Sequence, residues 1–318
     1  MPLFEMPLDE LRAYQGRNPR PADFDAYWRR ALDELESTPA NVELMPHPSP
    51  ARFAETFDLW FTGSGGARVH AQYMRPRDKG PHPALLRFHG YSMNAGDWFD
   101  KLAWVAQGFV VAALDVRGQG GLSEDAGGVT GTTLEGQIIR GLAGDPDRLL
   151  FRHIFLDTVR LAHVVMEQAE VDPERVAATG RSQGGGLTIA CAALEPRIWR
   201  AAPVYPFLSD YKRVWEMDLA KDAYEELVYW FTRFDPTHAH EEETWTKLGY
   251  IDVQHLADRI KARVQMTTGL MDMICPPSTQ FAAYNKIRSE KDIVLYPDFG
   301  HEDLPGHNDR LFEFLSRA

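Results

Sequence analysis

Two cysteines in 318 residues are too few for a disulfide scaffold. Cys191 lies in an apolar helical pattern and Cys275 precedes two prolines, so we expect two free thiols in a reducing compartment. Basic residues are also scarce, since 34 Lys and Arg against 46 Asp and Glu give a formal net charge of −12. Because phosphate binding needs a basic surface, this charge argues against a nucleic-acid partner.

Long hydrophobic runs are missing as well. No apolar stretch approaches the length needed to span a bilayer, so no membrane association is expected. The first ten residues, MPLFEMPLDE, contain neither the basic segment nor the apolar segment of a secretory signal. These features together predict a cytoplasmic protein.

Short apolar runs that alternate with helical patterns fill most of the chain. Such runs occupy residues 84–88, 108–114, 175–179, 264–268 and 292–296. Strands that alternate with helices predict an α/β fold, here a mostly parallel twisted sheet with helices on both faces. Before these runs, alternating patterns at 53–59 and 69–74 flank a glycine-rich turn and predict an antiparallel hairpin.

The domain organisation follows from where this alternation is interrupted. Residues 21–37 carry apolar side chains at helical spacing, which predicts a helix within an amino-terminal extension of about residues 1–40. Residues 207–250 are rich in aromatic and acidic side chains and predict a helical insertion packed over the sheet edge. We therefore expect residues 1–318 to form one α/β domain.

The segment GRSQG at residues 180–184 fits the motif G-x-S-x-G, with Ser182 at its centre. A strand pattern ends just before it and a helical pattern begins just after it. This motif requires a tight strand-to-helix turn that presents the serine hydroxyl at the carboxyl ends of the strands. The alternative is an ordinary glycine-rich turn, but the context favours Ser182 as the nucleophile of an α/β-hydrolase.

A serine hydroxyl needs a base to accept its proton, and in this fold the acid and then the histidine follow in the chain. Asp272 follows the run at 264–268, and His301 follows the last run. We predict that His301 is the general base and that Asp272 orients it. Asp298 and Asp303 are the alternative acids, but both are close to His301 in sequence and reach its Nδ1 less easily.

Two backbone N–H groups are expected to form the oxyanion hole. One comes from the residue after the nucleophile, Gln183, and the other from the loop after an early strand, where Tyr91 follows His89 and Gly90. Tyr91 is also the residue expected to contact the substrate. We interpret His89 as a buried loop anchor instead of a second base.

No metal or cofactor site is expected. His238, His240 and Glu241 lack the H-E-x-x-H arrangement and look like the start of a solvated acidic helix. No dinucleotide-binding glycine motif occurs in a strand-to-helix context. The segment DVRGQG at 115–120 lacks the Lys-Ser/Thr ending of a phosphate loop, and Arg117 is expected to form a buried or half-buried ion pair that stiffens the active-site loops.

Several motifs together resemble one family, the acetyl xylan esterase and cephalosporin C deacetylase group, carbohydrate esterase family seven. The similarity covers nearly the whole chain and is far more specific than G-x-S-x-G alone. The segments that carry it are HGY at 89–91, DVRGQG at 115–120, RSQGGG at 181–186, Asp272 with CPPST at 275–279, and GHE at 300–302.

This resemblance implies properties that spacing does not. It implies removal of acetyl groups from small acetylated sugars and from the antibiotic cephalosporin C, by an intracellular enzyme without a cofactor. It also implies a homohexamer built as a trimer of dimers, with the family's catalytic residues at Ser182, Asp272 and His301 and its oxyanion donors at Tyr91 and Gln183. Relatives often have smaller residues near Met93, so the size of the acyl pocket is left open.

Two other functions remain as alternatives. A peptidase of the same fold would use the same three residues, but many such peptidases carry an additional β-rich domain that is not evident here. A non-catalytic binding protein on a hydrolase scaffold would usually lack one member of the triad, and none is missing.

Overall fold

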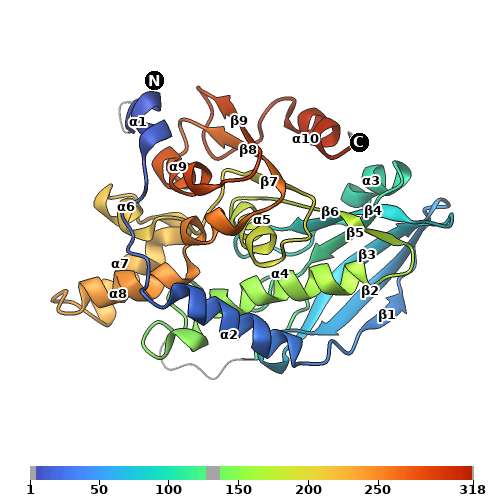
Figure 1. Cartoon of the computed structure of the whole chain (residues 1–318), viewed down its shortest axis with the longest axis horizontal. Helices are drawn as coiled ribbons and strands as arrows, with labels where there is room; N and C mark the ends of the chain where they lie inside the picture. The colour runs from blue at the N-terminus through green and yellow to red at the C-terminus, as the bar shows by residue number, and fades with distance from the viewer. Residues whose placement is uncertain (1–4, 127–136, 317–318) are drawn as a thin grey trace.

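A nine-stranded mixed sheet forms the centre of the protein, whose structure is a computed structural model describing residues 5–126 and 137–316 (Figure 1). The strand order is β1-β2-β3-β5-β4-β6-β7-β8-β9, and the six strands from β5 to β9 in this order are parallel. The strands are β1 (Glu43–Pro46), β2 (Ala54–Thr62), β3 (Arg68–Pro76), β4 (His82–Phe88), β5 (Val110–Leu114), β6 (Val171–Arg181), β7 (Arg200–Val204), β8 (Arg263–Gly269) and β9 (Lys291–Tyr296).

The predicted hairpin is confirmed as β2 and β3, which pair antiparallel over nine residues each. The strand β1, which the sequence did not predict, extends this antiparallel edge. Its four residues are mostly exposed and show no alternation, so they carry no strand pattern.

Helices cover both faces of the sheet, as predicted. The helices are α1 (Leu8–Ala13), α2 (Phe24–Glu36), α3 (Leu102–Ala106), α4 (Leu150–Met166), α5 (Gln183–Leu194), α6 (Tyr211–Glu216), α7 (Glu225–Arg233), α8 (Glu241–Leu248), α9 (Pro277–Lys286) and α10 (His307–Ser316). Alternate residues of β5 show the two faces: Val110 and Ala112 pack with α2, α4 and α5, whereas Val111 packs with α3 and α10 (Figure 1). This arrangement confirms the predicted α/β-hydrolase fold.

The strand β7 was also not predicted. It has five residues, all buried, and it contains Pro203, a residue that usually argues against a central strand. The ladder to β8 pairs Ala201 with Val264 and Val204 with Thr267, with no pair recorded at positions 202 and 203. The proline is therefore accommodated where pairing with β8 is interrupted.

Helices α6, α7 and α8 lie within residues 207–250, in agreement with a helical segment after β7. The division of the chain into extension, core and insertion stays a prediction, and the first four residues of the extension lie outside the described residues. Among the residues that the structure describes, no helix is long and apolar enough to cross a membrane.

An amino-terminal strap, residues 5–18, ties the start of the chain to distant segments. The Glu5 carboxylate accepts hydrogen bonds from the Ser278 backbone N–H at 2.9 Å and from Arg213 at 3.1 Å. The buried Asp210 carboxylate accepts bonds from the Tyr14 hydroxyl at 2.7 Å and the Asn18 N–H at 2.8 Å. The helix α1 packs against α9, so the strap supports the helix that follows the Asp272 loop (Figure 1).

Candidate active site

Ser182 lies at the turn between β6 and α5 with φ 57° and ψ −119°. A positive φ is costly for a serine and persists only when neighbouring structure fixes it. Here the Ser182 N–H donates to the Val204 carbonyl at 3.0 Å, and its carbonyl accepts from the Phe207 N–H at 3.0 Å. These two bonds hold the strained turn that the sequence motif predicted.

The glycines on both sides of Ser182 are required by close approach of the backbone. A Cβ atom at Gly180 or Gly184 would overlap the carbonyl of Phe88 at the end of β4. The motif therefore lets β4 and α5 approach closely enough for the loop after β4 to lie beside the serine.

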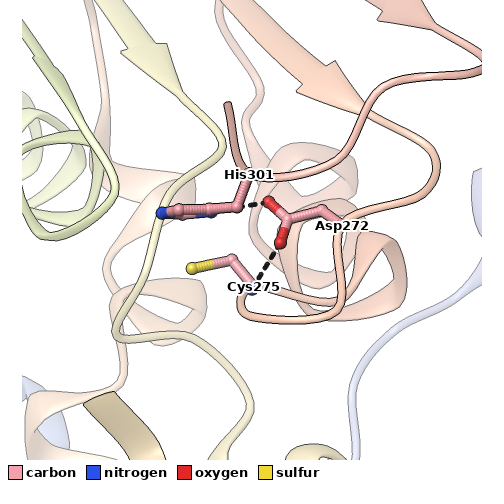
Figure 2. Close-up of side chains that lie close together, drawn as sticks. All are labelled: Asp272, Cys275 and His301. Carbon is pink, nitrogen blue, oxygen red and sulfur yellow. Dashed lines mark hydrogen bonds and ion pairs between the residues drawn. The ribbon is translucent and has the colours of Figure 1, made fainter. Parts of the chain in front are cut away.

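Asp272 and His301 meet at the carboxyl ends of β8 and β9 (Figure 2). His301 Nδ1 lies 2.8 Å from Asp272 Oδ2, and the carboxylate is fully buried. Asp272 Oδ1 accepts the backbone N–H groups of Ile274 at 2.9 Å and Cys275 at 2.8 Å. Since an ionised carboxylate only accepts, Nδ1 is the donor and Nε2 keeps a free lone pair for a proton.

The geometry shows which of the candidate acids contacts His301. Asp303 forms an ion pair with Arg181, and in the part of the chain that the structure describes Asp272 is the carboxylate that contacts the His301 ring. The ring of Tyr205 packs against the His301 ring, with centroids 4.5 Å apart, and so fixes the imidazole from another side.

Ser182 joins this cluster through Cys275. The Ser182 side chain lies beside the Cys275 thiol, close enough to oppose the rise that burial causes in the pKa of that thiol. Its sulfur, an Asp272 oxygen and a His301 ring nitrogen all lie within 4.8 Å of one another. The three predicted segments thus meet at one edge of the sheet.

The loops that carry Tyr91 and Gln183 are joined by a pair of amides. Gln119 Nε2 donates to Gln183 Oε1 at 2.7 Å, and Gln183 Nε2 donates back to Gln119 Oε1 at 2.9 Å. Gln119 Oε1 also accepts the Ser92 N–H at 2.9 Å. The residue after Tyr91 is thereby tied to the residue after the nucleophile, which brings the two predicted donors to the same region.

His89 anchors a loop, as predicted. Its Nδ1 donates to the Gly90 carbonyl at 2.7 Å, and its Nε2 accepts the Val116 N–H at 2.9 Å. Burial lowers the pKa of His89, which keeps the ring neutral and able to accept.

The predicted buried ion pair of Arg117 is confirmed, and its partner is Asp157 on α4. The guanidinium and the carboxylate make two bonds, at 2.6 and 2.7 Å, and both side chains are almost fully buried. The guanidinium also donates a third bond, to the Ser64 carbonyl at 2.9 Å, so this pair fixes the loop after β5 to the hairpin turn.

Exposed methionines surround the candidate site. Met93 in the loop after Tyr91 is 61% exposed, and its sulfur approaches Gly90. Met271 and Met273 flank Asp272 and are also exposed. These flexible apolar side chains are available to contact a substrate.

Sequence reasoning missed several residues that support the site. Gln280 on α9 is fully buried and donates to the Cys275 carbonyl at 2.6 Å and to Asp272 Oδ2 at 3.4 Å. The roles of Gln119, Tyr205 and the Cys275 thiol were not predicted either. Their only signal in the sequence is that each lies just after a strand or beside a motif residue.

His238 and Glu241, which the sequence analysis considered as metal ligands, contact each other and a neighbouring ring. His238 stacks on Phe231 with ring centroids 4.4 Å apart, and it pairs with Glu241 at 2.9 Å. Among the described residues, the group of donors that could hold an ion consists of Asp272, Cys275 and His301.

The fold defines the class of the protein. A nucleophile-elbow serine, an acid and a histidine in this chain order, at the carboxyl edge of a mostly parallel sheet, are the features of an α/β-hydrolase. The family model of acetyl xylan esterase (AXE1) matches residues 1–318. The chain therefore belongs to the acetyl xylan esterase family, a family of carboxylic ester hydrolases.

Individual relatives agree with this membership. The structure of acetyl xylan esterase 1 from Thermoanaerobacterium sp. JW/SL YS485 is 60% identical, covers 98% of both chains and has a TM-score of 0.97. An acetyl xylan esterase from Paenibacillus sp. R4 is 36% identical over 98% of this chain and 99% of its own, with a TM-score of 0.93. Acetyl esterase Axe7A from Xylanibacter ruminicola is 26% identical over 87% of this chain, which spans 62% of that relative's length.

Proposed function

We propose that the protein is a serine carboxylesterase that removes acetyl groups from acetylated xylo-oligosaccharides and from the acetyl ester of cephalosporin C. The observation that carries this proposal is the hydrogen bond of 2.8 Å between His301 and the buried Asp272, beside a serine in a strained strand-to-helix turn. Family membership supports the acetyl group as the acyl part.

The reaction proceeds in two halves on Ser182. His301 Nε2 takes the hydroxyl proton as Ser182 Oγ attacks the acetyl carbonyl, and the imidazolium then gives that proton to the leaving sugar oxygen. A water molecule, activated by the same nitrogen, hydrolyses the acetyl-enzyme. Asp272 stabilises the imidazolium in both halves, since its carboxylate faces Nδ1.

The negative oxygen of each tetrahedral intermediate is bound by the N–H groups of Tyr91 and Gln183. Each such donor typically contributes about 3–4 kcal/mol to lowering the barrier. The N–H of Gln183 lies at the start of α5, where the helix dipole also favours negative charge. Tyr91, whose ring packs edge-on against Phe207, and Met93 contact the substrate.

The family resemblance also supports a proposal for the assembly and location. We propose a homohexamer, a trimer of dimers, in the cytoplasm. Two buried free cysteines are in keeping with a reducing compartment. Sedimentation velocity of the purified protein tests the assembly, and a species of the monomer's mass would refute it.

Replacement of the nucleophile tests the function. Ser182→Ala should lower kcat on 4-nitrophenyl acetate by at least about 10⁴-fold, because loss of one triad member removes concerted proton transfer and attack. Ser37→Ala, at an exposed serine after α2, is the matched control and should keep full activity. A fluorophosphonate should label the wild type but not Ser182→Ala, and lack of labelling in the wild type would favour a non-catalytic binding protein.

The substrate class needs a separate comparison. Acetyl, propionyl and butyryl esters, acetylated xylo-oligosaccharides, cephalosporin C and a peptide amide should be assayed together. We expect kcat/KM to be highest for acetyl esters. Faster hydrolysis of the amide would instead support the peptidase alternative.

A further inference from the structure

The Cys275 thiol belongs to the candidate active site but has no role in the proposed reaction. It lies beside the Ser182 side chain, and it is fully buried. Figure 2 shows the thiol extending alongside the His301 imidazole, close to the Asp272 carboxylate. The sulfur therefore lies among three groups on which catalysis depends.

Sulfur, imidazole nitrogen and carboxylate oxygen are the three donor types that zinc prefers. The three donor atoms here lie within 4.8 Å of one another. In a tetrahedral zinc site with bonds of about 2.0 to 2.3 Å, ligand atoms are about 3.3 to 3.7 Å apart. The His301 Nδ1 and Asp272 Oδ2 atoms, 2.8 Å apart, therefore have to separate by about 0.5 Å, and the Cys275 sulfur has to approach them by up to about 1 Å. Small rotations of the Cys275 and His301 side chains provide both movements while the Asp272 carboxylate stays in place.

We propose that Asp272, Cys275 and His301 form an inhibitory site for a thiophilic divalent cation of the zinc and cadmium type. Coordination replaces the proton of the Cys275 thiol by the metal and releases that proton to solvent. His301 binds through Nδ1, which faces Asp272, so the Nδ1 proton moves to Nε2. A protonated Nε2 has no lone pair to accept the Ser182 proton, which accounts for the inhibition. The inhibitory effect rests on the proposed function, whereas the binding of the cation does not.

The burial pattern supports both access and selectivity. The Asp272 side chain is inaccessible, while the His301 side chain is 17% exposed, so a cation enters from the imidazole side. Hard cations such as Mg²⁺ prefer several oxygen ligands and retain water, so a site with one thiolate and one imidazole discriminates against them. Inhibition should therefore occur with Zn²⁺ and Cd²⁺ but not with Mg²⁺.

The first experiment measures binding directly. Titration of the full chain with Cd²⁺ should produce the ultraviolet charge-transfer absorption of a thiolate–cadmium bond. The band should persist in Cys191→Ala, because the Cys191 thiol is buried against α4 and donates to the Thr158 carbonyl at 3.7 Å. It should be lost in Cys275→Ala. A band that survives in Cys275→Ala, or no band in the wild type at millimolar Cd²⁺, overturns the proposal.

The second experiment measures inhibition, with each variant compared to its own metal-free rate. Zn²⁺ should inhibit the wild type and Cys191→Ala reversibly, with recovery on addition of EDTA. Cys275→Ser keeps a similar volume, so it serves if the alanine variant does not fold. It should need at least about tenfold more Zn²⁺ for half-inhibition, because a hydroxyl replaces the thiolate. Equal Zn²⁺ sensitivity of wild type and Cys275→Ser would contradict the proposal. If the protein had no esterase activity, the cadmium titration would still test whether the cation binds.

Discussion

Asp272 satisfies nearly all of its acceptor capacity within one short loop. Its Oδ1 accepts two backbone N–H groups, and its Oδ2 faces both His301 Nδ1 and the Gln280 amide. Such a carboxylate can rotate little, so it fixes the orientation of the imidazole as well as its tautomer.

This arrangement predicts the effect of Asp272→Asn. An asparagine keeps the two backbone bonds only if its oxygen takes the place of Oδ1, which turns its NH₂ group toward His301. Nδ1 must then accept, the proton moves to Nε2, and the base for Ser182 is lost. In the well-studied serine protease triad, the same change lowers kcat about 10⁴-fold.

We expect a decrease of this order here, with KM changed little, in steady-state hydrolysis of an acetyl ester. Asp303→Asn is the control, since Asp303 is an exposed partner of Arg181 and should keep near-normal kcat. If Asp272→Asn retained more than about a tenth of wild-type kcat, Asp272 would not be the orienting acid.

Among individual residues, the sequence predicted those that belong to motifs in a defined chain order. The sequence allowed prediction of Ser182, Asp272 and His301, because each follows a strand pattern in the order that the fold requires. It did not allow prediction of Gln119, Gln280 and Tyr205, because their importance comes from contacts with residues 64, 8 and 96 positions away in the chain. A single sequence does not indicate which of many buried amides and rings will meet.

Among the elements, the loop after β5 is joined both to the start of α5 and to the loop after β4. The reciprocal amides of Gln119 and Gln183 make the first connection, and Gln119 Oε1, which also accepts the Ser92 N–H beside Tyr91, makes the second. The Gln119 side chain thus connects the two backbone donors that we propose for the oxyanion hole.

Gln119→Ala should loosen this connection. We expect kcat to fall by about 10-fold, less than the about 10²–10³-fold that follows complete loss of one oxyanion donor, because the N–H groups remain but are less well oriented. Steady-state kinetics should be compared with Gln107→Ala, at an exposed glutamine after α3. Unchanged kcat in Gln119→Ala would mean that the amide pair does not position the donors.

Elements with a clear pattern were predicted well, and the two missed strands had physical reasons. In β7 tertiary packing overrides the unfavourable Pro203, since all five of its residues are buried between β6 and β8. In β1 hydrogen bonding to β2 forms a strand from exposed residues that no hydrophobic pattern marks. Both strands result from long-range pairing that periodicity does not record.

For the whole molecule, buried histidines contribute to the loss of stability in acid. Burial, with nearby Lys286 and Arg20, lowers the pKa of His255 to about 3, and burial with Arg117 and Arg152 lowers that of His153 to about 4. Between these values and 6.5 the unfolded chain binds protons that the folded chain does not. The free energy of unfolding therefore decreases as pH falls through this window.

In His255→Asn the free energy of unfolding should decrease less steeply as the pH is lowered. Each histidine contributes up to about 1.4 kcal/mol per pH unit to the slope of stability against pH, and the variant lacks one of them. Urea unfolding between pH 4.5 and 7 measures the slope, with His240→Asn at an exposed position as control. A slope identical to wild type in His255→Asn would show that this ring is protonated in the folded state.

The amino-terminal strap has a consequence for how the enzyme matures. The strap joins Glu5 to Ser278, which lies 273 positions further along the chain. It also joins Tyr14 and Asn18 to the distant Asp210. We expect these contacts to form slowly, because closing a large loop costs chain entropy before the contact forms. Since α1 packs against α9, the helix after the Asp272 loop, we expect esterase activity to appear during refolding only after residues 5–18 have docked.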